Sequence, residues 1–342
     1  MLTARQERIL SHVVDGYQRT GQPVASKVIA ADPELDCGAS TVRHELALLE
    51  EMGLLDHPHT SAGRLPTDAG HRYVVDRMLC TGQGLLPAPR LDLSVTRQEV
   101  EDAMRVTTET LSQVTNLLAV VSAPSANTAT IRHVEVLALQ PRMVMAVIIT
   151  STGGVSKVLA TLEGPIDPGL LAWAGEYLNE RLVGLNLGAR MVHQRLVDPA
   201  LPATERAFLD RLAPAIGALG SEAEDMLYVE GTSRLFSADN HLAEVTEINE
   251  LMGLLERRVA LLDVLRAALS KPGVYVRIGH ENSNPAMRSL ALVASGYGVA
   301  RRRLGTVSVI GPVRMDYAQA IPTVREAAIE LSRFVEDAYG EN

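Results

Sequence analysis

Two groups of β-strand patterns, separated by a long helical stretch, constrain the fold of this chain most. The first group consists of the segments "RHVEVLALQ", "RMVMAVIIT" and "GGVSKVLATLE", which predict adjacent antiparallel strands. Helical patterns follow, from "DPGLLAWAGEYLNERLVG" onward, before strands resume with "GVYVRIG", "LALVAS" and "GTVSVIG" and a last helix closes the chain. This order predicts an α+β multidomain protein in which one α/β domain is interrupted by a mainly helical insertion.

Residues 95–122 are predicted to form one long helix. An apolar stripe runs along it at helical spacing and consists of Val100, Met104, Leu111, Val114 and Leu118. Such a stripe is typical of a core or of a contact between helices, and less so of a cofactor site. The preceding segment, "CTGQGLLPAPRLDLS", is rich in Gly and Pro, which indicates a linker.

Three short helices are predicted ahead of that linker. Thr3 and Gln6 have the spacing of a capping box at the start of the first helix, which Gly21 ends. A second helix covers about residues 25–31, and a third covers about residues 40–52.

A small hairpin and a fourth helix come next. The segments "LLDHP" and "GRLPTDAG" predict two short extended pieces joined by a turn, after which Thr67 or Asp68 caps a helix. Three helices followed by a hairpin are the element order of a winged helix-turn-helix, with the hairpin as the wing. A plain helical bundle with a loop does not account for the hairpin.

The bulk composition excludes several classes of protein. The chain has 342 residues, 46% of them hydrophobic and 21% charged, which is ordinary globular composition. No apolar run is long enough to cross a membrane, and the charged start "MLTARQERIL" is unlike a secretory signal. The only two cysteines, Cys37 and Cys80, make neither a disulfide framework nor a zinc pattern. We therefore expect a cytoplasmic protein.

The charge balance does not by itself indicate a nucleic-acid partner. The net charge is −9; residues 1–80 hold 8 Lys and Arg against 11 Asp and Glu, so −3 lies there and −6 in the remainder. A DNA-binding face must therefore come from the spatial segregation of charges.

The third helix has a polar outer face at its N-terminal end. With about 100° per residue, Val42, Leu46 and Leu49 share the core side. The residues on the opposite side are short or polar and include one arginine: Ser40, Arg43, His44 and Ala47. A recognition helix needs such a face, although an ordinary solvated helix face has the same pattern.

The chemistry of this face suits double-stranded DNA. Arg43 can pair with guanine O6 and N7 or with a phosphate. Ser40 and Thr41 can donate hydrogen bonds to phosphate, which the helix N-terminus also attracts.

The hairpin segment "HPHTSAGRLPTDAG" adds a second group of donors. His59, Thr60, Ser61 and Arg64 surround two small residues that would let the backbone approach a phosphate closely. Pro58 and Pro66 restrict the segment, and Arg64 is expected at its tip, in a minor groove or on a phosphate. Arg72 adds positive charge on the next helix. The simpler interpretation is a structural turn with one exposed arginine.

Other sites are weakly indicated. His57, His59 and His71 lack the carboxylate–histidine spacing of a metal site. The segment "TSTGGVSK" lacks the spacing of a phosphate-binding loop, and "GHENSN" is most simply a polar turn. No motif asks for an enzyme, a metal or a cofactor.

Three segments together resemble one protein family. The segments are "YQRTGQPVASKVIA", "STVRHELALLEEMGLLDHPHTSAGRLPTDAGHRYVVDRM" and "GTVSVIGPVRMDY". They are similar to HrcA, the heat-inducible transcription repressor of bacteria, and the resemblance covers most of the chain in order. The hairpin and "IGPVRMDY" are two independent markers.

The resemblance implies a negative regulator of heat-shock chaperone operons that binds an inverted-repeat operator as a homodimer. It implies that the chaperonin GroEL–GroES promotes the DNA-binding form and that heat releases the repressor. It also implies a winged-helix domain, a GAF-like domain and an inserted dimerisation domain. We therefore expect this division: 1–80 winged-helix DNA-binding domain, 81–94 linker, 95–163 first part of the GAF-like domain, 164–249 inserted dimerisation domain, and 250–342 second part of the GAF-like domain.

Three positions depart from the family pattern. Gly38 and Ala39 stand where the family usually has two serines, and His44 follows Arg43 in place of asparagine. His71 replaces the tyrosine of the usual Gly-Tyr-Arg. The first changes touch the base-reading helix, so the preferred operator sequence is expected to differ.

Two alternatives stay open at the level of sequence. One is a winged-helix regulator controlled by a small-molecule ligand in the GAF-like domain, against which the aromatic content of 4% counts mildly. The other is a winged-helix module that binds proteins and not DNA, which fits the acidic net charge.

Overall fold

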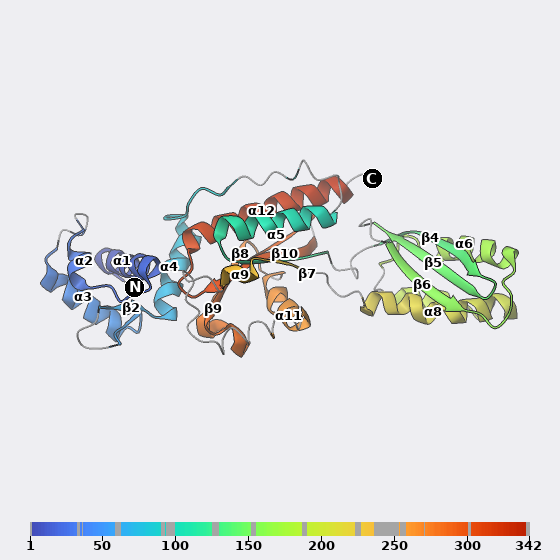
Figure 1. Cartoon of the computed structure of the whole chain (residues 1–342), viewed down its shortest axis with the longest axis horizontal. Coiled ribbons are helices and arrows are strands. Elements are labelled where there is room, and N and C mark those ends of the chain that lie inside the picture. Colours follow the sequence, from blue (N-terminus) through green and yellow to red (C-terminus); the bar gives the residue numbers. More distant parts are fainter. Residues whose placement is uncertain are drawn as a thin grey trace.

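The computed structural model describes residues 2–32, 35, 37–58, 63–89, 93, 100–124, 130–151, 155–186, 190–222, 227–235, 253, 258–269, 271–299 and 302–339. Its elements form three lobes in a row (Figure 1). The N-terminal lobe contains α1 to α4, the central lobe contains a five-stranded sheet, and the insertion lobe contains a three-stranded sheet. This mixture of helices and antiparallel sheets confirms the α+β class. None of the described helices is long and apolar enough to cross a membrane.

The N-terminal lobe is built as the sequence predicts. Thr3 and Gln6 form the expected capping box at the start of α1, and Gly21 ends that helix in the left-handed conformation. Buried aliphatic side chains from α1, α2, α3 and β1 form its core, together with Val74 of α4. The elements are α1 (Ala4–Thr20), α2 (Ser26–Ala30), α3 (Ala39–Glu51), β1 (Leu55–Asp56), β2 (Leu65–Pro66) and α4 (Asp68–Thr81).

The predicted hairpin is confirmed as an antiparallel pair of two-residue strands, β1 and β2. Two glycines allow it to pack tightly against the helices. A Cβ atom at Gly63 would lie 2.3 Å from the carbonyl oxygen of Val24, and one at Gly70 would lie 2.2 Å from that of Leu54. Small residues in this segment are therefore required by packing within the lobe. Thr67 caps α4, accepting a hydrogen bond from the backbone N–H of Gly70.

The central lobe is an antiparallel sheet with strand order β7-β3-β10-β9-β8. Its strands alternate between two hydrophobic clusters: Ala119, Val121, Val307 and Val309 face α5 and α12, whereas Leu118, Val120 and Ile310 face α11. The elements are α5 (Val100–Thr115), β3 (Leu118–Ser122), β7 (Leu227–Glu230), α9 (Thr232–Leu235), α11 (Arg258–Leu269), β8 (Val274–Ile278), η3 (Gly279–Glu281), η4 (Pro285–Met287), β9 (Leu290–Val299), β10 (Arg302–Pro312) and α12 (Tyr317–Tyr339).

The prediction of one helix over residues 95–122 is wrong at its C-terminal end. The helix ends at Thr115, Asn116 adopts a positive φ of 54°, and Leu118–Ser122 is a central strand. A strand that is buried on both faces has a continuous apolar sequence, and periodicity cannot distinguish such a run from a buried helix segment.

The insertion lobe contains the first group of predicted strands. β4, β5 and β6 pair antiparallel in that order, as expected, and α6, α7 and α8 pack with one face of their sheet. The elements are β4 (Ile131–Gln140), β5 (Met143–Thr150), β6 (Val155–Thr161), α6 (Pro168–Leu182), α7 (Arg190–Leu196) and α8 (Ala203–Glu222).

This arrangement differs from the predicted division of the chain. Residues 131–161 were expected to join the C-terminal strands, with the insertion starting at residue 164. Instead they form a separate sheet, because the helices that cover it are the ones that follow it in sequence. The inserted unit is thus mixed helix and sheet. Of the helical stretch predicted over residues 241–269, the described residues are Gly253 and α11.

Candidate nucleic-acid interface

The exposed face of α3 is the one that the helical periodicity predicts. Val42, Leu46 and Leu49 are buried in the N-terminal core. Thr41 is half-buried, and the exposed positions are Ser40, Arg43, His44 and Ala47. The Nε of Arg43 donates to the carbonyl oxygen of Ala39 at 3.2 Å, which directs the side chain along the first turn. One end of α3 therefore presents a cation and small polar groups to solvent.

The first turn of α3 has no side-chain cap. Gly38 is the N-cap residue, and among the described residues no side-chain cap hydrogen bond is made to this turn. In the usual family pattern two serines stand at positions 38 and 39. Glycine and alanine have no side-chain oxygen that could accept a hydrogen bond from the backbone N–H groups of this turn.

Arg64 does not lie at the tip of the hairpin, contrary to the prediction from sequence. It stands directly before β2, where its backbone exchanges two hydrogen bonds with Val24, at 2.8 and 2.9 Å. Its guanidinium pairs with Glu50 at the C-terminal end of α3, at 2.8 Å, and His57 pairs with the same carboxylate. Arg64 therefore ties the base of the hairpin to α3. The predicted site residues His59, Thr60 and Ser61 lie outside the described residues.

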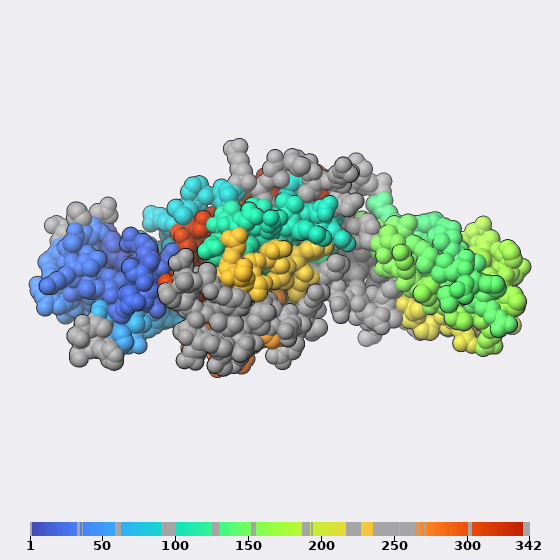
Figure 2. Space-filling model, viewed as in Figure 1, coloured from blue at the N-terminus to red at the C-terminus, as the bar shows by residue number. Residues whose placement is uncertain are grey.

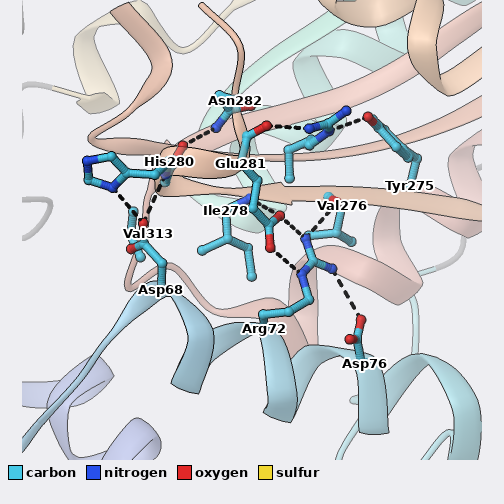
Figure 3. Close-up of polar contacts among 12 residues, drawn as sticks. Asp68, Arg72, Asp76, Tyr275, Val276, Ile278, His280, Glu281, Asn282 and Val313 are labelled. Atoms are coloured by element: carbon cyan, nitrogen blue, oxygen red, sulfur yellow. Dashed lines mark hydrogen bonds and ion pairs between the residues drawn. The ribbon is translucent and has the colours of Figure 1, made fainter. Parts of the chain in front are cut away.

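The structure does not bring Arg72 to the exposed face of α3. Its guanidinium forms two hydrogen bonds to the carboxylate of Glu281, one of them from Nε at 2.7 Å, and it donates to the carbonyl oxygen of Val276 at 2.8 Å (Figure 3). A further bond, to Asp76, spans one turn of α4 at 3.2 Å. Arg72 thus connects α4 with β8 and η3 of the central lobe, which sequence spacing could not reveal across more than 200 positions.

His71 is buried where α4 meets the central lobe. Its ring lies between those of Tyr17 and Tyr317, with centroid distances of 6.3 and 6.2 Å. Burial lowers the pKa of His71 to about 4, although the nearby Asp68 carboxylate opposes this shift, so the ring is neutral at neutral pH. Among the residues that the structure describes, no three His, Cys, Asp or Glu side chains gather as a metal site.

Two further segments, to which the sequence gives no role in a junction, complete it. The segment "GHENSN", interpreted as a polar turn, forms η3, and both His280 and Glu281 bond to α4. The family marker "VRMDY" supplies Tyr317 and also Arg314, whose guanidinium lies against Gly21 at the end of α1. In Figure 2, atoms of C-terminal residues lie directly beside the N-terminal lobe at this place.

Comparison with known proteins defines the class. The family model described as the HrcA protein C-terminal domain matches residues 101–321. A heat-inducible transcription repressor HrcA of Parafrankia sp. is 32% identical over 96% of this chain and 97% of its own length. One from Streptomyces avermitilis is 34% identical with the same coverage. A crystal structure of a hypothetical protein has the same fold, with a TM-score of 0.68 and 21% identity over 99% of this chain and all of its own.

These relatives and the fold define a multidomain transcription repressor. The chain belongs to the HrcA family of heat-inducible transcription repressors.

Proposed function

We propose that the chain represses heat-shock chaperone operons by binding an inverted-repeat operator as a homodimer. The observation that carries the DNA-binding part is the exposed, uncapped N-terminal end of α3 with Arg43, beside a hairpin tied to the same helix through Glu50. We infer that residues 1–80 are a winged-helix domain, α3 its recognition helix and the hairpin its wing.

The four predicted residues on α3 take distinct parts in this proposal. Arg43 reads a base edge in the major groove, with guanine as its expected partner. Ser40 and Thr41 donate to the phosphate that meets the helix N-terminus, and His44 takes the position that in family members usually holds asparagine. His59, Thr60 and Ser61 stay in the proposal as wing contacts by their place in the family motif. Arg64 and Arg72 are better assigned to internal ion pairs.

The outer face of the insertion sheet supports the homodimer. Leu137, Met145 and Leu159 lie side by side across β4, β5 and β6, on the face turned away from α6 and α8. Leu137 is 41% exposed and Leu159 is 59% exposed. A contiguous apolar sheet face of this kind is typical of an interface, and we propose that a second copy of the chain covers it.

The remaining assignments rest on the family resemblance. We infer that the central sheet with α5, α11 and α12 is the GAF-like domain. We infer also that the chaperonin GroEL–GroES promotes the DNA-binding form and that unfolded clients, which occupy the chaperonin during heat stress, withdraw this support. The relatives are named heat-inducible transcription repressors, which supports the regulation by heat.

The substitution Arg43→Ala tests the base-reading role. We expect it to remove discrimination at one base pair of each half-site, by about 1–3 kcal/mol, because the bidentate contact of one guanidinium with one base is lost. Affinities of wild type and variant for a set of operators with single base-pair changes check this. A uniform loss of affinity on all sequences would assign Arg43 to the phosphate backbone instead.

A further inference from the structure

Helix α4 belongs to the cores of two lobes. Val74 is buried in the N-terminal cluster, whereas its neighbour Val75, about 100° further around the helix, is buried in the central cluster. Met78 packs against both clusters. The N-terminal lobe therefore joins the central lobe through a shared helix, packed on both sides.

Polar contacts at the N-terminal half of α4 fix this helix against η3, and we name them the α4–η3 contact. It consists of the pairs Arg72–Glu281 and Asp68–His280 (Figure 3). Glu281 accepts from Arg72 and also from the backbone N–H of Ile278, at 2.9 Å. Since the side chains of Arg72 and Glu281 are only 24% and 31% exposed, separating them would leave two partly desolvated charges.

The second pair depends on a close approach at Gly279. Oδ2 of Asp68 accepts from the backbone N–H of His280 at 2.9 Å and lies 3.0 Å from its Nδ1. Gly279 has a φ of 52°, and a Cβ atom there would lie 2.0 Å from Oδ2 of Asp68. A side chain at position 279 would displace the Asp68 carboxylate, which would then lose its contacts with His280 and no longer hold the first turn of α4 against η3.

Further polar contacts extend from α4 to the exposed helix α3. Glu7 of α1 accepts from the hydroxyl of Tyr73 at 2.7 Å and pairs with Arg77 at 2.8 Å, so α1 is fixed to α4. Gln6, also on α1, donates from Nε2 to Glu45 of α3 at 3.0 Å. The position of α3 relative to the central lobe thus follows from the position of α4.

We propose that the α4–η3 contact sets the distance and orientation between the two α3 helices of a dimer, and thereby the operator spacing that the repressor accepts. Asp68, Arg72 and Glu281 are then positioning residues for DNA recognition, although none of them touches DNA. The proposal rests on the proposed homodimer and operator binding. Base contacts recognise the sequence of each half-site but not the spacing between half-sites. That spacing is matched by the positions of the two α3 helices, which the junction sets.

The substitution Gly279→Ala tests this most directly, because it removes no charge and no contact to DNA. Its effect is measured on a series of operators that carry identical half-sites with spacers altered by single base pairs. Each inserted pair rotates one half-site by about 35° relative to the other. We expect wild type to bind one spacing at least tenfold better than its neighbours, and Gly279→Ala to discriminate less than threefold.

Gly273→Ala is the matched control, because Gly273 also has a positive φ, 75°, but open space around its missing Cβ. It should keep the spacing preference of wild type. Arg72→Gln serves as a second variant and should relax the preference in the same direction. If Gly279→Ala fails to fold, as judged by its thermal unfolding transition, Asp68→Asn takes its place.

Two further measurements separate this proposal from the proposed function. Affinity for a single half-site and the oligomeric state by sedimentation should be the same in Gly279→Ala and wild type. A full spacing preference in folded Gly279→Ala and Arg72→Gln would overturn the positioning role. Failure of wild type to dimerise or to bind the inverted repeat at any spacing would instead overturn the proposed function.

Discussion

His71 is a buried residue at which this chain departs from its family pattern, because most members have tyrosine at this position. Burial between Tyr17 and Tyr317 keeps the imidazole neutral, with a pKa of about 4. The sequence shows three histidines near the hairpin, which first raises the question of a metal. The structure answers it through packing: His71 points into the junction between the two lobes and away from solvent.

The pKa of His71 predicts a pH-dependent stability. The unfolded chain binds a proton at this residue below about pH 6.5, whereas the folded chain does so only near pH 4, so stability is present at neutral pH and is lost as the pH falls. Between pH 7 and pH 5 this costs about 2 kcal/mol. Urea unfolding of His71→Phe should show a pH dependence smaller by about that amount. Equal pH slopes for the variant and wild type would contradict the buried, neutral state.

The arginines show that the sequence does not reveal which cations are exposed and which form internal ion pairs. Arg43, Arg64 and Arg72 look alike as candidate DNA contacts, since each is a cation near the predicted recognition helix. Only the fold separates them, because Arg64 finds Glu50 and Arg72 finds Glu281, while Arg43 stays exposed. A guanidinium reaches several ångströms from its backbone, so local spacing does not determine its partner.

At the scale of elements, the sequence predicts helix ends well where capping residues or a helix-ending glycine mark them. The capping box at Thr3 and the end of the first helix at Gly21 are confirmed, and of the two candidate caps Thr67 and Asp68 it is Thr67 that caps α4. The strand Leu118–Ser122 was missed because it is apolar on both faces and directly follows a helix. Short apolar runs take their structure from the sheet that they join, here from pairing with β7 and β10.

The hairpin depends on close packing at Gly63, which predicts a large effect for one methyl group. In Gly63→Ala the new Cβ would meet the backbone of Val24, so the segment before β2 must move away from the segment before α2. We expect a loss of about 1–3 kcal/mol of stability and weaker DNA binding. Gly164→Ala, whose Cβ meets nothing within 4 Å, should leave both unchanged. Thermal unfolding and operator titration check the pair, and an unchanged Gly63→Ala would contradict this account of the hairpin.

At the scale of the whole molecule, the sequence predicts the order of strands and helices but not which strands share a sheet. The strands at 131–161 and those at 274–312 have similar apolar patterns, and nothing local separates them. Pairing between strands far apart in sequence decides the lobes: β3 joins β10 across more than 180 positions, while β4 to β6 pair only with each other. The junction between α4 and η3 could not be predicted for the same reason, since its residues are more than 200 positions apart in the sequence.

The outer face of the insertion sheet predicts how the molecule dimerises. Leu159→Glu places a charge in the apolar row and should convert the dimer to monomers, because burying an unpaired carboxylate is costly. Val197→Glu is the matched control, since Val197 is 57% exposed but lies after α7, outside the sheet. Sedimentation equilibrium measures both, and a dimeric Leu159→Glu would place the interface elsewhere.

The most direct test of the central claim is a fluorescence-anisotropy titration of the full chain on a labelled inverted repeat, at two salt concentrations, against a scrambled duplex of equal length. The account predicts that the inverted repeat binds at least 1000-fold more tightly than the scrambled duplex, with affinity falling as salt rises because phosphate contacts release counterions. Equal affinity for both duplexes, or no binding at either salt concentration, would contradict it.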